Sequence, residues 1–343
     1  MPSAVIKPFY AHLKKQGFEP RYVRDAMLPD WWEDALFENP SNRLTAQMSA
    51  ARYLGVRLQD IIDENAVKLH TGNLRLKRGR AETPSEVLGA VTAALHAARM
   101  TASLMQRHLP FTGMRSALQV REQLLSDPGR SVPNLRNLLD YCWQHGIGVV
   151  HVTRMPRVPG AKKIEGLATF IGERPVIVLC SGRSSPAWLA FHLAHELGHI
   201  MREHVKQGDQ PLVDIKLETT IDDADEAEAN QYAFQVLTGK PKPAFSGKIS
   251  SVPDLAAVAQ KYGEVNNVDP GTVALIYGYS QNCIPMAQAA LKILEVNLGG
   301  ASQLLANAFR KHVELEDVPE SIERSLSTTT QIYGMTLPEN ADA

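Results

Sequence analysis

One short stretch of the chain carries residues that can bind a metal ion. His195, Glu196 and His199 form a His-Glu-x-x-His motif, and the apolar residues around it recur with the spacing of a mostly buried helix. Since His195 and His199 are four positions apart, a helix places both imidazoles on one face, where their ring nitrogens can reach the same metal ion. Glu196 then lies beside the metal's open position and can act as a base. The alternative is a core helix with two incidental histidines.

A second predicted helix, at residues 225–234, offers a third metal ligand. A catalytic zinc ion usually has three protein ligands and one open position, and Glu226 is the best candidate for the third. Asn230 falls on the same helix face as Glu226 and can hydrogen-bond a ligating imidazole. Glu228 points elsewhere and is expected to face solvent. Together the two helices favour a zinc-dependent hydrolytic site over incidental histidines.

The order of these motifs is similar to that of a known family. After two predicted strands, a Pro-Ala-x-x-x-Phe-x-x-Ala-His-Glu-x-Gly-His helix begins at Pro186, and Glu-x-x-Ala-Asn-x-x-Ala begins at Glu226. On these motifs, residues 146–237 resemble the ImmA/IrrE family of metallo-endopeptidases. The match covers about a quarter of the chain strongly.

The resemblance implies a set of roles and a substrate. His195, His199 and Glu226 would be the zinc ligands and Glu196 the base, with Mn²⁺ able to replace Zn²⁺ in vitro. The family further implies a helix-turn-helix repressor, encoded nearby, as the protein that is cut. Its cleavage would derepress stress, mobile-element or defence genes.

The composition of the whole chain is that of an ordinary globular protein. With 343 residues, 44% hydrophobic and 21% charged, two or three domains are expected. No apolar run is long enough to span a membrane, and the first residues do not form a secretory signal. The odd number of cysteines, without a Cys-x-x-Cys pair, disfavours a disulfide framework. A cytoplasmic location is therefore expected. One alternative is that Cys142, Cys180 or Cys283 supplies a thiolate to the open position of the zinc ion.

Residues 1–66 are predicted to form a helical domain that resembles a repressor-type helix-turn-helix domain. Its short helices are expected at about 10–16, 20–27, 30–37, 44–54 and 58–65, with the closest match at 47–62. The helix in the recognition position, Asp30–Glu38, is acidic and has no Arg, Lys, Asn or Gln, so it suits the reading of DNA bases poorly. Trp31 and Trp32 are expected to be core or interface anchors. Docking or homodimer formation is favoured over DNA binding.

The rest of the chain is divided into a basic linker at 67–82, a metallopeptidase core at 83–245 and a C-terminal helical region at 246–343. The linker is interpreted as a solvated connector, with a phosphate-contacting arm as the alternative. The core should contain helices at about 83–108, 115–125 and 133–145 and strands at 147–152, 168–171 and 176–179, the last two forming a hairpin. Residues 209–223 are expected to be a surface loop. Further helices are expected at 252–262, 271–277, 284–298 and 302–313, and the tail from Ser325 should be loosely ordered.

The expected fold class is therefore α+β and mostly helical. It would consist of a gluzincin-like metallopeptidase core with a small three-stranded sheet, preceded by the helix-turn-helix-like domain. The competing hypothesis is a DNA-binding transcriptional regulator or antitoxin-like protein whose metal site is structural or inactive.

Overall fold

The structure is a computed structural model, and it describes residues 5–63, 75–76, 87–106, 109–126, 132–156, 163–208, 211–215, 224–245, 247–316 and 318–332. The predicted linker at 67–82 lies largely outside these residues. The expected α+β class with mostly helical content is confirmed.

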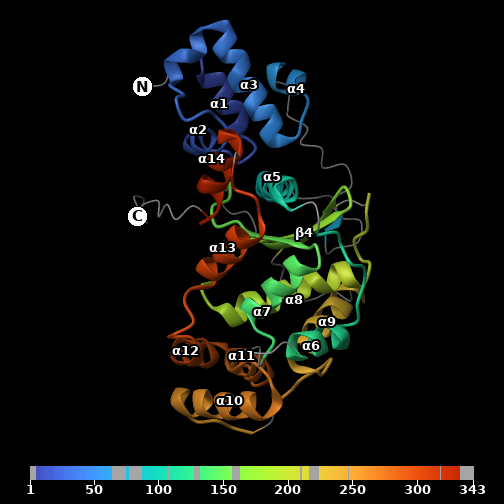
Figure 1. Ribbon diagram of the computed structural model, residues 1–343. Helices are drawn as coiled ribbons and strands as arrows, with labels where there is room; N and C mark the ends of the chain where they lie inside the picture. Colours follow the sequence, from blue (N-terminus) through green and yellow to red (C-terminus); the bar gives the residue numbers. More distant parts are fainter. Residues whose placement is uncertain are drawn as a thin grey trace.

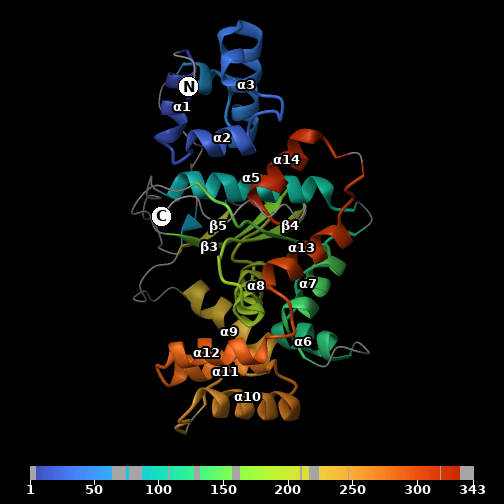
Figure 2. The same cartoon turned by 90° about the vertical axis from the view of Figure 1, so that its left-hand side faces the viewer.

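The elements form successive layers along one direction (Figures 1 and 2). At one end lies an N-terminal group of helices, followed by α5, the sheet, α7 and α8, then α9 and α6, and finally α10–α12 at the other end. The helices are α1 (Lys7–Lys14), α2 (Pro20–Ala26), α3 (Pro40–Leu54), α4 (Leu58–Ile62), α5 (Leu88–Leu104), α6 (Ala117–Ser126), α7 (Leu135–Gln144), α8 (Pro186–Met201), α9 (Ala224–Thr238), α10 (Val252–Asn266), α11 (Pro270–Ser280), α12 (Ile284–Leu294), α13 (Ala301–His312) and α14 (Glu320–Thr329).

The sheet is larger than the three strands that the sequence predicts. Its order is β1-β5-β3-β4-β2, with the strands at β1 (Arg75–Leu76), β2 (Gly148–His151), β3 (Ile164–Ile171), β4 (Arg174–Leu179) and β5 (Leu212–Ile215). The predicted hairpin is confirmed, since β3 and β4 pair antiparallel and turn at Gly172, whose φ is +62°. The prediction that 209–223 is a surface loop is wrong at β5, which pairs antiparallel with β3.

The main hydrophobic core fills both faces of this sheet. Helix α5 packs on one face and α8 on the other, and the strands contribute residues with almost no exposed surface, among them Leu167, Ile177 and Val178. A sheet that is covered on both faces needs continuous apolar strands, and the sequence Val176–Leu179 is entirely apolar. The sheet therefore provides a rigid floor beneath α8.

The N-terminal helices have a core of their own, but one predicted helix is absent. The segment Asp30–Glu38 contains only a short 3₁₀ helix at Asp34–Glu38, with Trp31 half exposed and Trp32 buried against Phe37. Pro29 and the Trp-Trp pair precede it, and no capping side chain starts a longer helix. Helices α3 and α4 are joined by Gly55, which ends α3 in the left-handed conformation.

The C-terminal region contributes to two different hydrophobic clusters. Helices α10–α12 share a cluster of their own, whereas α13 and α14 place Leu305, Phe309 and Leu326 in the main core. The expected loosely ordered tail is wrong for 325–329, because α14 buries Ser325 and Thr329 and packs against α2 and α5. Asp269 caps α11, since its carboxylate accepts a hydrogen bond from the backbone N–H of Thr272. Among the described residues, no helix is both long enough and apolar enough to cross a membrane.

Candidate metal centre

The His-Glu-x-x-His motif lies on α8, a helix that is buried along nearly its whole length. Ser185 caps the start of α8 by accepting from the backbone N–H of Trp188, and Pro186 occupies the first helical position. Glu295, at the end of α12, adds a second cap, because its Oε1 accepts from Ser185 Oγ at 2.8 Å and from the Ala187 N–H at 2.9 Å. Ser185 and the sequence-distant Glu295 thus together fix where α8 begins.

Gly198 allows α9 to lie directly against α8. A Cβ atom at this position would lie 3.1 Å from the carbonyl oxygen of Ala229 and 3.2 Å from its Cα. These are backbone atoms of α9, so a side chain at 198 would push the two helices apart. This contact brings Glu226 within reach of the two histidines.

The three predicted ligands meet at one point. The Nε2 atoms of His195 and His199 lie 3.1 Å apart, and the Glu226 carboxylate oxygens lie 3.4 Å from His195 Nε2 and 3.3 Å from His199 Nε2. Ligand atoms about 2.0–2.2 Å from one tetrahedral ion are about 3.3–3.6 Å from one another. The observed separations are close to these values, so the three side chains could hold one metal ion.

The charge state of the site also suits a metal ion. Burial lowers the pKa of His199 to about 4, opposed by its hydrogen bond to the Glu226 carboxylate. The imidazole is therefore neutral at physiological pH and has a lone pair to offer, as a metal ligand must. With the carboxylate of Glu226 as the third donor, the set is two nitrogens and one oxygen, a combination that suits zinc.

Each candidate histidine ligand is held from behind by a second residue. When Nε2 binds a metal ion, Nδ1 carries the ring proton. His195 Nδ1 then donates to Asn230 Oδ1, 3.0 Å away, which is the contact that the helical spacing of Asn230 and Glu226 predicts. His199 Nδ1 lies 3.0 Å from Nδ1 of His204, so His204 must accept there and carry its own proton on Nε2. That Nε2 lies 3.4 Å from the Glu228 carboxylate.

The role of His204 follows from a tertiary contact that its position in the sequence does not indicate. Its imidazole is buried, and it links the ligand His199 to Glu228, which is about half exposed and paired with Arg202 at 3.1 Å. The hydrogen bond from Arg202 lowers the pKa of Glu228, which keeps the carboxylate charged. The chain His199–His204–Glu228 thus ends in a negative charge that favours a protonated Nε2 on His204. The expectation that Glu228 faces solvent is correct only for part of its side chain.

Glu196 is fully buried next to strand β3. A Cβ atom on Gly166 would lie only 2.3 Å from Glu196 Oε1, so only a glycine at 166 leaves room for this carboxylate. The pairing of β3 with β5 shifts register between Ile164 and Gly166, at the same point. A glycine within an apolar strand is the sequence signal of such a close approach, and it could have identified Gly166.

Among the described residues, His192, Tyr232 and the cysteines do not belong to the ligand set. His192 contacts Glu165, with 3.2 Å between Nε2 and Oε2, and Tyr232 donates to the carbonyl of Arg115. None of the three cysteines forms a disulfide, and the metal-binding group found among the described residues contains none of them. Burial raises the pKa of Cys142, which keeps it a thiol.

Comparisons of the chain with protein-family models, curated proteins and solved structures give no match. What can be said about this centre therefore follows from the residues and their geometry.

Proposed function

We propose that the chain is a zinc-dependent endopeptidase. The observation that carries this proposal is the convergence of His195, His199 and Glu226 on one point, with the buried carboxylate of Glu196 on the same helix as both histidines. Three protein ligands leave a fourth position of a zinc ion for water and substrate, which distinguishes a catalytic site from a four-ligand structural site. No fourth His, Cys, Asp or Glu joins the group among the described residues.

Different residues of the site have different roles in peptide hydrolysis. A zinc ion held by His195, His199 and Glu226 would lower the pKa of a bound water and polarise the carbonyl group of the scissile peptide. Glu196 accepts the proton that the attacking water loses and then delivers it to the leaving nitrogen. Burial of Glu196 against Gly166 holds its carboxylate in one place and excludes bulk water from it. Asn230 and His204 hold the two imidazoles in the orientation that binding requires.

The substrate that we propose is a helix-turn-helix transcriptional repressor encoded near the gene of this chain. This part of the proposal comes from the resemblance of residues 146–237 to the ImmA/IrrE family. Cleavage of such a repressor would release stress, mobile-element or defence genes from repression.

The proposal is tested by incubating the full chain, loaded with zinc or manganese, with the repressor encoded beside its gene. We expect a discrete cut in the repressor, identified by mass spectrometry. The Glu196→Gln variant keeps the shape of the side chain but removes its basicity, so cleavage should fall by about 100- to 10,000-fold while zinc stays bound. Undiminished cleavage by Glu196→Gln would remove Glu196 from the mechanism.

The same experiment separates the peptidase from a DNA-binding regulator with an inactive metal site. Specific binding of a DNA duplex by the chain, together with no cleavage of the repressor at stoichiometric zinc, would contradict the proposed function.

A further inference from the structure

Helices α8 and α9 present matching faces that lead away from the candidate metal centre. On α9, Glu226, Asn230 and Phe234 are spaced by four residues, so they lie in a row. On α8, His195 is preceded by Phe191, whose ring centroid lies 6.3 Å from that of His195. The rings of Phe191 and Phe234 are 5.2 Å apart. On both helices, an aromatic side chain thus lies one to two turns away from a candidate metal ligand.

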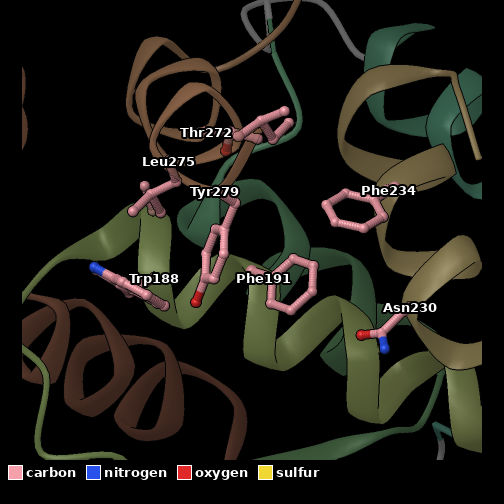
Figure 3. A pocket seen from close by; sticks show the side chains of 9 residues that line it. Trp188, Phe191, Asn230, Phe234, Thr272, Leu275 and Tyr279 are labelled. Carbon is pink, nitrogen blue, oxygen red and sulfur yellow. The ribbon is translucent and has the colours of Figure 1, made fainter. Parts of the chain in front are cut away.

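A cavity of about 310 Å³ opens at this aromatic end (Figure 3). Asn230 lines it and also contacts His195, so the cavity begins one residue away from the metal ligands. Its other walls come from α8, α9 and α11 and consist mainly of apolar and aromatic side chains: Ala187, Trp188, Phe191, Phe234, Thr272, Leu275, Ile276 and Tyr279.

The lining has no charged side chain and few free polar groups. Thr272 is held by the cap at Asp269, since its hydroxyl lies 3.2 Å from Asp269 Oδ2. Trp188 is buried, and the ring of Tyr279 packs edge-on against it at 5.8 Å. Removing a charged side chain from water into such a site costs several kcal/mol without a partner. An apolar side chain gains free energy by leaving water there.

We propose that this cavity binds one large apolar side chain, aromatic or long aliphatic, of a substrate residue that flanks the scissile bond. The inference rests on the proposed peptidase function and adds the substrate preference to it. The cavity has the size at which small-ligand pockets begin, about 300 Å³, so it suits a single large side chain and not a folded segment. Helix α11 forms the outer wall, so the C-terminal helices select the substrate residue.

The test uses succinyl hydroxamates, which bind the metal ion and carry a methyl, isobutyl, benzyl or carboxymethyl group in the place of the substrate side chain. Their affinities for the zinc-loaded full chain are measured by calorimetry, with acetohydroxamate as the probe of the metal ion alone. We expect the isobutyl or benzyl compound to bind at least 10-fold more tightly than the methyl compound. The carboxymethyl compound should bind most weakly.

Two variants of α11 connect this preference to the cavity. Leu275→Trp fills it, and Tyr279→Ala opens it at an exposed position that carries little risk to folding. Either change should reduce the ratio of the affinities of the benzyl and methyl compounds at least 5-fold. The affinity for acetohydroxamate should stay unchanged. Val265→Trp, at a position of α10 that is 75% exposed, serves as the matched control and should keep the ratio.

The outcomes separate this inference from the proposed function. Tight acetohydroxamate binding with equal affinities for the methyl and benzyl compounds, or a ratio that Leu275→Trp and Tyr279→Ala leave unchanged, would overturn the apolar cavity and leave the peptidase proposal standing. Absence of acetohydroxamate binding to zinc-loaded protein would contradict both.

Discussion

The residues that hydrogen-bond the candidate metal ligands affect the affinity of the centre for a metal ion. His199 is buried and has only one ring nitrogen to offer to the metal, so the other nitrogen needs a partner. His204 fills that role, and Glu228 in turn orients His204. The ligand imidazole is therefore fixed in both tautomer and direction.

Replacing His204 should weaken the metal site without unfolding the protein. In His204→Gln the ring that accepts from His199 Nδ1 is lost, and we expect zinc affinity to fall by about 10- to 100-fold. Affinity is measured by competition with a chelator of known strength. The matched control is His312→Gln, which removes a histidine that stacks on Trp143 and lies 3.7 Å from Asp140. Equal loss of affinity in both variants would show that His204 has no special role.

The sequence predicts the ligands at this scale because they depend on local geometry. The spacing of His195 and His199 requires only a helix, and the pairing of Glu226 with Asn230 requires only a second one. His204 and Gly166 act through contacts outside these helices. His204 follows the end of α8, where Glu203 has a φ of +58°, so helical spacing does not apply to it.

At the scale of elements, the contact between α8 and α9 positions the third ligand. In Gly198→Ala the better helix propensity of alanine, about 1 kcal/mol, is opposed by contact of its Cβ with the α9 backbone. Overpacking of a core typically costs about 1–3 kcal/mol. We expect a net loss of about 1 kcal/mol in the free energy of unfolding and a fall in zinc affinity, since Glu226 moves away from the imidazoles. Urea unfolding and chelator competition measure the two effects.

The control for this prediction is Gly182→Ala. A Cβ at 182 meets no atom within 4 Å, so neither stability nor zinc affinity should fall. A Gly198→Ala variant as stable as the wild type, with unchanged zinc affinity, would show that α9 adjusts freely.

The contact between the N-terminal helices and α5 should make the stability of the protein depend on pH. His96 of α5 is buried and stacks on Tyr53 of α3 with ring centroids 4.0 Å apart. Burial, and then the charge of Arg99, lower its pKa to about 3. In the unfolded chain this imidazole binds a proton as the pH falls below about 6.5. In the folded chain it stays neutral until the pH approaches 3. The contribution of His96 to stability is thus complete above about pH 6.5 and is lost as the pH falls toward 3.

The size of the effect follows from linkage. Between about pH 6 and pH 4 the free energy of unfolding should fall by about 1.4 kcal/mol per pH unit through His96. The His96→Phe variant cannot take up this proton and should show a shallower slope. Urea unfolding of both proteins at several pH values measures the difference, and parallel curves would contradict the prediction.

Most elements could be predicted from hydrophobic periodicity, but those that depend on tertiary contacts could not. The helices at 252–262 and 302–313 were expected and correspond to α10 and α13. Strand β5 lies in a polar stretch and forms because β3 offers it an edge. Helix α14 has a polar sequence and is stabilised by contact with the N-terminal helices, where Arg324 and Thr328 donate to the carbonyl of Asp25.

At the scale of the whole molecule, the layers place the candidate centre between two helical groups. The N-terminal helices lie beyond the sheet, on the side away from α8, and Arg154 joins them to the core through Asp25 at 2.9 Å. Helices α10–α12 lie beyond α8 and α9, where α11 closes the cavity. We infer that substrate selection belongs to the C-terminal group.

The binding of one zinc ion by His195, His199 and Glu226 is tested by a crystal structure of the zinc-loaded chain with anomalous diffraction measured at the zinc absorption edge. We expect one strong anomalous peak about 2.0–2.2 Å from His195 Nε2, His199 Nε2 and a carboxylate oxygen of Glu226. In a Glu226→Gln crystal the peak should be much weaker. A zinc ion bound elsewhere, or no peak at these three residues, would contradict this expectation.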